Sequence, residues 1–161
     1  MFYYKIGGNM EKIYLADESF TYDMGQKIGR ALFSGAIICL NGDLGAGKTA
    51  MTKSIAKALG IDEDITSPTF TIVNEYRDGR LKLNHFDVYR IGSSDEMYDI
   101  GFDEYINSDG VSIIEWSTII EDILPEERLD IDINYEGMGR TIEFIPHGEK
   151  YEKLVGEVVG Q

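Results

Sequence analysis

Apolar residues change their spacing along one stretch of the chain, between residues 36 and 60. Ala36–Leu40 is a continuous apolar run of strand length, which is typical of a strand buried on both faces. The next segment carries apolar residues at helical spacing: Met51, Ile55, Ala58 and Leu59. Gly60 then stands where a helix typically stops. The pattern predicts a strand, a glycine-rich loop and a helix, in that order.

The same periodicities predict the other elements. Strands are expected at Lys12–Leu15, Thr69–Tyr76, Leu81–Tyr89, Val111–Ile114, Leu129–Tyr135 and Thr141–Ile145. Helices are expected after a cap at Asp17 or Ser19, from the capping box Ser93–Glu96 toward Ile106, before Leu124–Pro125, and over 149–159. Hairpin turns are expected at Arg77–Arg80, with a central Asp-Gly, and at Glu136–Arg140. These elements predict one α/β domain over residues 1–161. Its central sheet is mixed, mostly parallel and flanked by helices, with hairpin strands.

Composition is consistent with a single globular domain of 161 residues, with 43% hydrophobic and 27% charged residues. No apolar run reaches the ~18–20 residues of a membrane span. The first residues lack the core of a signal peptide, so we expect a cytoplasmic location and no membrane association. A start at Met10 would make residues 1–9 an N-terminal extension. Cys39 is the only cysteine, which excludes a disulfide framework.

The formal net charge is −14, which bears on whether the chain can bind nucleic acid directly. Such a field repels phosphate backbones, so we expect no autonomous binding of nucleic acid. A role in nucleic-acid metabolism would run through a protein partner.

One segment matches the phosphate-binding pattern G-x-x-x-x-G-K-[ST] at every specified position: Gly42, Asp43, Leu44, Gly45, Ala46, Gly47, Lys48 and Thr49. The glycines leave room for amide groups to surround phosphate oxygens. Lys48 can reach the β- and γ-phosphates, and the Thr49 hydroxyl can bind Mg²⁺. The alternative is a glycine-rich surface turn. The flanking strand and helix favour a phosphate loop at a helix N-terminus, and hence the P-loop NTPase fold.

Two predicted strands end in an acid, at Asp87 and at Glu115. Ligands of open α/β sheets sit at the carboxyl ends of strands, so both acids are candidates to hold Mg²⁺ or to orient water. The alternative for each is a solvated loop acid. Ser67–Phe70, a Ser-Pro-Thr-Phe turn, is either a segment that senses the γ-phosphate or a plain helix-to-strand turn.

Four motifs occur in one order: Leu40–Thr49, Ser67–Phe70, His85–Arg90 and Ile114–Trp116. Together they resemble the TsaE (YjeE) family of bacterial ATPases in tRNA threonylcarbamoyladenosine biosynthesis. The resemblance spans roughly residues 12 to 146.

The resemblance implies roles for particular residues. Lys48 would bind phosphate, and Asp87 would be the Walker B-type acid. Thr49 and Glu115 would hold Mg²⁺, with Asp87 as a further candidate ligand, so Lys48, Asp87 and Glu115 are the candidate catalytic residues. Further residues are implied to lie at the nucleotide: Ser67, Thr69, Trp116, Glu18, Gly139 and Arg140. The alternatives are that Trp116 is plain core and Arg140 a solvated hairpin charge, while His85 is expected to be structural.

The resemblance also implies Mg²⁺-dependent hydrolysis of ATP, slow alone, in partnership with a TsaD–TsaB pair. TsaD would transfer the threonylcarbamoyl group to adenosine 37 of tRNA. One rival is a small-molecule kinase, although Arg77 and Arg80 flank a hairpin-type Asp-Gly and do not suggest a lid. A GTPase is disfavoured because the guanine-reading Asn-Lys-x-Asp pattern is absent. A nucleotide-sensing module without turnover remains open, because it would need the same site residues.

Overall fold

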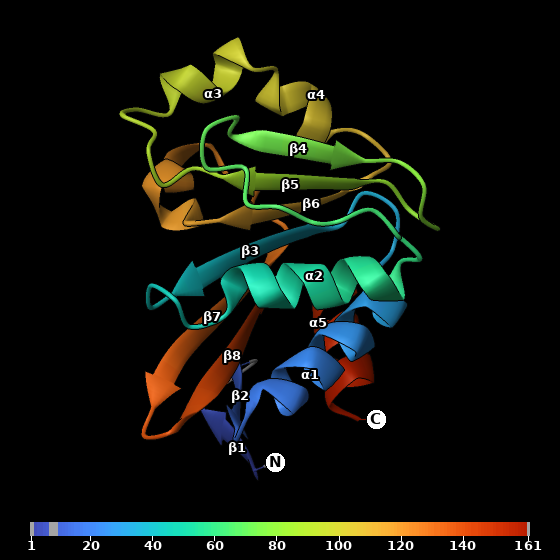
Figure 1. Cartoon of the computed structure of the whole chain (residues 1–161), viewed down its shortest axis with the longest axis vertical. Helices are drawn as coiled ribbons and strands as arrows, with labels where there is room; N and C mark the ends of the chain where they lie inside the picture. Colours follow the sequence, from blue (N-terminus) through green and yellow to red (C-terminus); the bar gives the residue numbers. More distant parts are fainter. Residues whose placement is uncertain (1, 7–9, 161) are drawn as a thin grey trace.

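The structure, a computed structural model, describes residues 2–6 and 10–160, with side chains from residue 12 onward. Within this part of the chain, one eight-stranded sheet has the order β1-β2-β8-β7-β3-β6-β5-β4 (Figure 1). The strands are β1 (Phe2–Ile6), β2 (Met10–Leu15), β3 (Ile37–Gly42), β4 (Val73–Tyr76), β5 (Leu83–Asp87), β6 (Val111–Glu115), β7 (Arg128–Glu136) and β8 (Gly139–His147). The helices are α1 (Glu18–Ala31), α2 (Lys48–Ala58), α3 (Asp95–Asp99), α4 (Phe102–Ile106), the 3-10 helix η1 (Ser117–Ile123) and α5 (Glu149–Val159).

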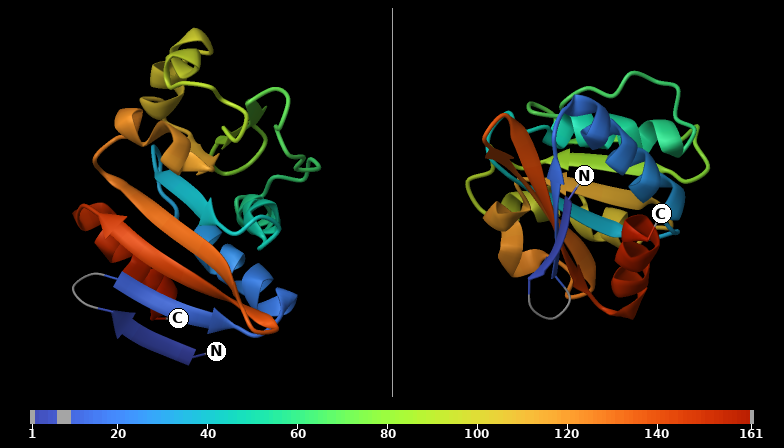
Figure 2. Two further views of the ribbon diagram at one scale, coloured as in Figure 1. Left: turned by 90° about the vertical axis from the view of Figure 1, so that its left-hand side faces the viewer. Right: turned by 90° about the horizontal axis from the view of Figure 1, so that it is seen from below.

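The sheet is mixed, as the sequence predicts. Strands β7, β3, β6 and β5 are parallel, while β8, β2 and β1 at one end and β4 at the other are antiparallel to their neighbours. Seen from below, β1, β2 and β8 run at a steep angle to β5 and β6, so the sheet is strongly twisted (Figure 2). The prediction of an α/β fold with hairpin strands is confirmed.

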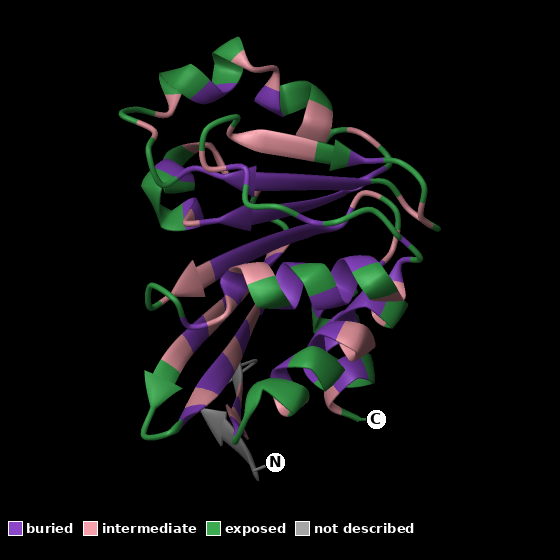
Figure 3. Cartoon of the chain, in the orientation of Figure 1, coloured by how far each residue is buried: buried purple, intermediate pink, exposed green. Residues whose placement is uncertain are grey.

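Each face of the sheet has its own apolar cluster. One face packs against α1, α2 and α5, through residues such as Met24, Ile55 and Leu154. The other packs against α3, α4 and η1, through Phe102 and Ile120 among others. Because β5 and β6 are covered on both faces, every residue in them is buried, whereas β7 and β8 mostly alternate between buried and half-buried residues (Figure 3).

Several predicted boundaries are wrong for local reasons. The strand expected from Thr69 begins only at Val73, because the segment before it folds into a turn in which Ile72 N–H donates to the Pro68 carbonyl at 2.8 Å. The helix expected after the capping box is divided into α3 and α4 at Gly101, whose φ is +79°. Asp17 is the cap of α1, and its side chain accepts from the amides of the first turn.

Residues 2–6 form strand β1, which pairs antiparallel with β2. Part of the predicted N-terminal extension therefore joins the sheet, while residues 1 and 7–9 lie outside the described residues. No helix in the described part of the chain is long and apolar enough to cross a membrane.

Candidate functional site

The loop between β3 and α2 has the backbone of an anion-binding loop. Gly42, Gly45 and Gly47 have φ values of +127°, +76° and +114°, which residues with a Cβ rarely adopt. A Cβ on Gly42 would also overlap the carbonyl oxygen of Ile133 on β7. The loop leads directly into the first turn of α2, where free amides and the helix dipole favour negative charge.

Lys48, the first residue of α2, reaches back over this loop. Its Nζ donates to the carbonyl oxygens of Asp43 at 2.7 Å and Gly42 at 3.2 Å. The same ammonium lies 4.2 Å from the centre of the Trp116 ring, close enough for a cation–π contact. Burial lowers the pKa of Lys48, and three neighbouring carboxylates oppose that shift. The charge is thus held inside the site instead of in solvent.

Glu115 ends β6 beside this lysine and is only 2% exposed. The Thr49 hydroxyl donates to its Oε1 at 3.1 Å, while Oε2 also contacts Nε2 of His85, which is fully buried. Thr49 and Glu115, two of the three predicted magnesium ligands, therefore lie in direct contact.

Asp87 ends β5 in register with Glu115, so the two acids project from neighbouring strands at one edge of the sheet. One Asp87 carboxylate oxygen accepts from the amide of Tyr89 at 3.0 Å, and the other lies 3.5 Å from the Ser67 hydroxyl. The structure thus brings Asp87 to the cleft, where its hydrogen bonds are to the Tyr89 amide and to Ser67, and not to Thr49. Neither acid is a freely solvated loop acid.

The Ser-Pro-Thr-Phe turn covers the carboxyl end of β5. The hydroxyl oxygens of Ser67 and Thr69 are 2.7 Å apart, and the Phe70 side chain is 84% exposed. The turn ends at Ile72, a β-branched residue with φ of +71°, whose carbonyl accepts from the amide of Asp87 at 2.9 Å. Backbone strain of this kind costs about 1–3 kcal/mol and is concentrated at functional sites.

Trp116 follows Glu115 with φ of +63°, the other non-glycine residue with positive φ among those described. Its ring packs against Tyr89 with the ring centres 4.9 Å apart. Since it also lies under Lys48, Trp116 forms a wall of the site and is not plain core.

Two hollows lie on either side of the loop and share Gly45, Gly47 and Ala50. The first is a cleft of about 450 Å³ lined by Lys48, Thr49, Ser67, Thr69, Asp87, Glu115 and Trp116, among others. The second, of about 1040 Å³, is lined among others by Glu18, Lys53, Gly139 and Arg140. Every predicted site residue therefore lies in the loop or lines one of the two hollows that flank it.

The tip of the β7–β8 hairpin contacts the loop through Asn134 and Tyr135, which the sequence interpretation missed, and through Arg140, which it included. Asn134 Oδ1 accepts from the amide of Asp43 at 3.1 Å, and the amide of Tyr135 donates to the Asp43 carboxylate at 2.9 Å. Arg140 donates to the carbonyl of Ala46 at 3.1 Å and lies 4.2 Å above the Tyr135 ring, so it is not a free hairpin charge. These contacts join residues about 90 apart in sequence, and only the pairing of β7 with β3 reveals them.

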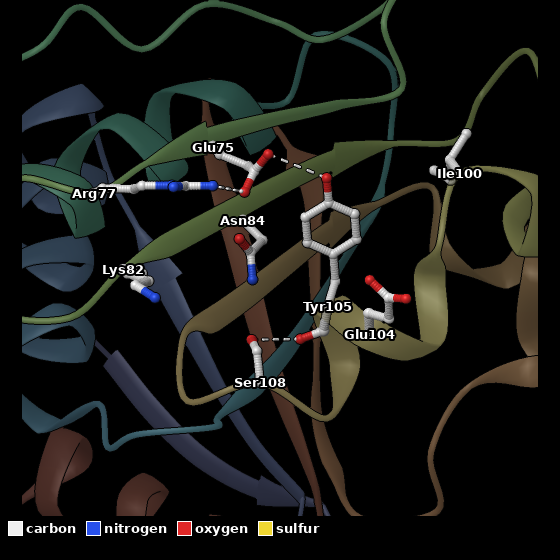
Figure 4. A pocket seen from close by; sticks show the side chains of 8 residues that line it. All are labelled: Glu75, Arg77, Lys82, Asn84, Ile100, Glu104, Tyr105 and Ser108. Carbon is white, nitrogen blue, oxygen red and sulfur yellow. Dashed lines mark hydrogen bonds and ion pairs between the residues drawn. The ribbon is translucent and has the colours of Figure 1, made fainter.

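A further pocket of about 350 Å³ lies at the opposite edge of the sheet (Figure 4). Two of its charged groups pair with each other: Glu75 binds Arg77 at 2.9 Å and also accepts from the Tyr105 hydroxyl at 3.2 Å. This pocket contains none of the predicted site residues.

Comparison with known proteins adds a family relationship to this geometry. The family model described as "Threonylcarbamoyl adenosine biosynthesis protein TsaE" matches residues 15–142. A Bacillus subtilis protein named tRNA threonylcarbamoyladenosine biosynthesis protein TsaE is 50% identical over 125 residues, covering 77% of this chain and 78% of that protein. A protein of the same name from Nostoc sp. is 43% identical over 142 residues, covering 85% of this chain and 86% of that protein.

The fold has a close counterpart among solved structures. The crystal structure of Bacillus subtilis YdiB superposes with a TM-score of 0.83 at 38% identity, covering 94% of this chain and 95% of that one.

Proposed function

The chain belongs to the TsaE family, and we propose that it is a Mg²⁺-dependent ATP-binding and hydrolysing subunit for threonylcarbamoyladenosine modification of tRNA. On this proposal it acts with the TsaD–TsaB pair and carries out no threonylcarbamoyl transfer itself. Its membership of the P-loop class rests on the loop, and its place in the tRNA pathway rests on the family.

One observation carries the hydrolytic part of the proposal: four functional groups meet in one cleft. The amides of the loop and the Lys48 ammonium supply positive potential for phosphate oxygens. Glu115 and Asp87 bring two carboxylates to the same cleft from neighbouring strands. A glycine-rich surface turn would need neither a buried lysine nor two acids directed at it.

The oxygens in this cleft suit Mg²⁺, which phosphates and water also coordinate, better than a metal ion that protein side chains alone would hold. The described residues contain no group of three His, Cys, Asp or Glu side chains able to hold a metal. Mg²⁺ is usually bound through one or two protein oxygens together with phosphates and water. Thr49 and Glu115, whose oxygens are 3.1 Å apart, are the residues that would hold it. When bound, it would neutralise charge on the phosphates.

Asp87 has a different role on this proposal. Its carboxylate is held by the Tyr89 amide and faces the Ser67 hydroxyl, so it can orient a water or sense the segment that covers the cleft. The hollow beside Glu18 and Arg140 is where the nucleoside would lie, since it adjoins the same loop. ATP is favoured over GTP because the chain lacks the guanine-reading pattern.

Hydrolysis would drive a cycle of docking and release. The segment Ser67–Ile72 borders the cleft and exposes Phe70, so a nucleotide that orders it would change the surface offered to a partner. With a net charge of −14, the chain would leave tRNA binding to its partners.

The decisive experiment measures ATP turnover by the chain alone, with the TsaD–TsaB pair, and with the pair plus tRNA, each with Mg²⁺ and with EDTA. We expect slow turnover alone, a marked increase with the pair, and none in EDTA. Binding without turnover in every mixture would identify a nucleotide-sensing module. Equal affinity for the pair with ATP, with ADP and without nucleotide would contradict the docking cycle.

A further inference from the structure

His85 on β5 is fully buried, and its ring contacts Glu115, the acid that also accepts a hydrogen bond from Thr49. We propose that His85 is a positioning residue, which holds the Glu115 carboxylate in the orientation needed to bind Mg²⁺. This inference rests on the proposed function, because it assigns His85 a role in the same metal site.

The two oxygens of Glu115 have different partners. Thr49 Oγ1 is nearer to Oε1, at 3.1 Å, than to Oε2, at 3.4 Å, whereas His85 contacts Oε2 alone. The terminal torsion of a glutamate is broad, so a carboxylate tethered by one oxygen only would rotate. Contacts at both oxygens fix its plane and keep Oε1 directed toward Thr49.

The two ring nitrogens show which form of His85 fits this contact. Nδ1 is the one buried side-chain polar atom without a hydrogen-bond partner in the described part of the chain. Nδ1 is unpaired whether or not it carries a proton, so the contact of Nε2 decides the assignment. An Nε2 without a proton would set its lone pair against the carboxylate oxygen, whereas Nε2–H donates to that oxygen. The hydrogen-bond partners therefore assign the Nε2–H form.

The burial of this position does not by itself call for a histidine. His85 lies on a strand buried on both faces, between Asn74 of β4 and Ile113 of β6, where an apolar side chain would pack. Replacing it with an apolar residue would remove the His85 contact and leave Oε2 with only the weaker 3.4 Å contact to Thr49, in a residue that is 2% exposed. Groups that orient metal ligands typically change metal affinity about 10–100-fold when removed.

The test compares His85→Gln with His85→Met. The two side chains are similar in length and volume, and only Gln can donate a hydrogen bond to Glu115. Trp116 is the only tryptophan, and its ring lies 4.2 Å from Lys48 Nζ, so its fluorescence reports on the loop without any turnover. ADP is titrated in EDTA, and Mg²⁺ is then titrated at fixed ADP, with thermal unfolding of each variant in parallel.

We expect His85→Met to raise the Mg²⁺ concentration at half-maximal response about 10-fold or more, with unchanged ADP affinity in EDTA. His85→Gln should stay within about threefold of the original chain. Equal shifts in the two variants, or no shift in either, would overturn the positioning role. If His85→Met does not fold, His85→Asn, whose amide is too short to reach Glu115, replaces it. If neither folds while His85→Gln does, the role is structural and the inference is wrong. A response of the original chain that is independent of Mg²⁺ would instead contradict the proposed function.

Discussion

The two antiparallel hairpins, β4–β5 and β7–β8, flank the same parallel strands, yet their turns lie at opposite edges of the sheet (Figure 1). The β4–β5 connection precedes a parallel strand, whereas the β7–β8 turn follows one. Because ligands bind at the carboxyl ends of parallel strands, only the second turn reaches the phosphate-loop edge. Strand direction, and not the turn sequence, decides which hairpin joins the site.

Their polar groups differ in the same way. Near the first turn, Arg77 and Glu75 form an exposed ion pair in the pocket at the far edge. At the second tip, Asn134 and Arg140 bond to the main chain of the phosphate loop. An exposed ion pair within a pocket does not indicate a binding site. Polar groups that hold the main chain of a neighbouring glycine-rich loop in place do indicate one.

The largest effect is expected on ATP turnover, when a lysine is removed from each of the two edges of the sheet. Lys48→Ala removes the cation over the phosphate loop, and we expect ATP turnover to fall about 100-fold or more. Lys82→Ala removes only an exposed ion pair of 3.8 Å with Asp109 and should change turnover less than about twofold. Steady-state ATP hydrolysis measures both, and retained turnover in Lys48→Ala would refute the assignment of the loop.

The next comparison concerns two glutamates. Glu115→Ala removes the acid bonded to Thr49, and we expect Mg²⁺-dependent hydrolysis to fall about 10–100-fold. Glu75→Ala, at the far edge, should leave hydrolysis unchanged. Thermal unfolding is measured alongside. A Glu115→Ala variant that is mainly unfolded would make this residue structural.

A smaller effect is expected when one arginine is removed from each hairpin. Arg140→Ala removes the hydrogen bond to Ala46 that ties the second tip to the loop. One such bond contributes about 1 kcal/mol, so nucleotide affinity should fall about fivefold. Arg77→Ala should leave the affinity within experimental error. Nucleotide titration followed by Trp116 fluorescence measures both; an equal loss in the two variants would argue against the contrast between the tips.

The strand, glycine-rich loop and helix could be predicted from sequence because they lie in one contiguous stretch, from Ala36 to Gly60. The turn of the second hairpin was also predicted correctly, because β7 ends at Glu136 and β8 begins at Gly139. The turn of the first hairpin could not be predicted as well. Asp-Gly at 78–79 suggested a tight turn, but β4 ends at Tyr76 and β5 begins at Leu83, and Gly79 does not adopt a positive φ. The loop packs instead against the end of α2, where Arg80 N–H donates to the Leu59 carbonyl at 2.6 Å. Tertiary contacts overrode the local turn preference.

Contacts between distant segments could not be predicted inside the site either. Asp87 and Glu115 could be named as candidates from sequence because each ends a predicted strand, and the structure places them in register on neighbouring strands. No local pattern marks Asn134 or Tyr135, which act on Asp43 only because β7 lies beside β3. His85 was expected to be structural, and its contact with Glu115 depends on the register of β5 against β6.

The smallest expected effect is a change in stability at Asp132 of β7, which faces Glu143 of β8 in the second hairpin. Burial raises the pKa of Asp132 above its ordinary value of 3.8, and the neighbouring carboxylates of Glu143 and Asp130 raise it further. The folded chain therefore holds this proton to higher pH than the unfolded chain does. Its contribution to stability is present below pH 3.8 and is lost as the pH rises through the raised pKa.

Asp132→Asn should consequently stabilise the chain at neutral pH, by less than about 1 kcal/mol, since the site is only half-buried. The gain should shrink as the pH falls toward 3.8, which urea unfolding at pH 7.5 and pH 4 would measure. Glu75→Gln serves as the control in the first hairpin, because that carboxylate faces Arg77 and its removal should give no gain. A gain from Asp132→Asn that is the same at both pH values would mean that packing, and not charge, distinguishes the two hairpins.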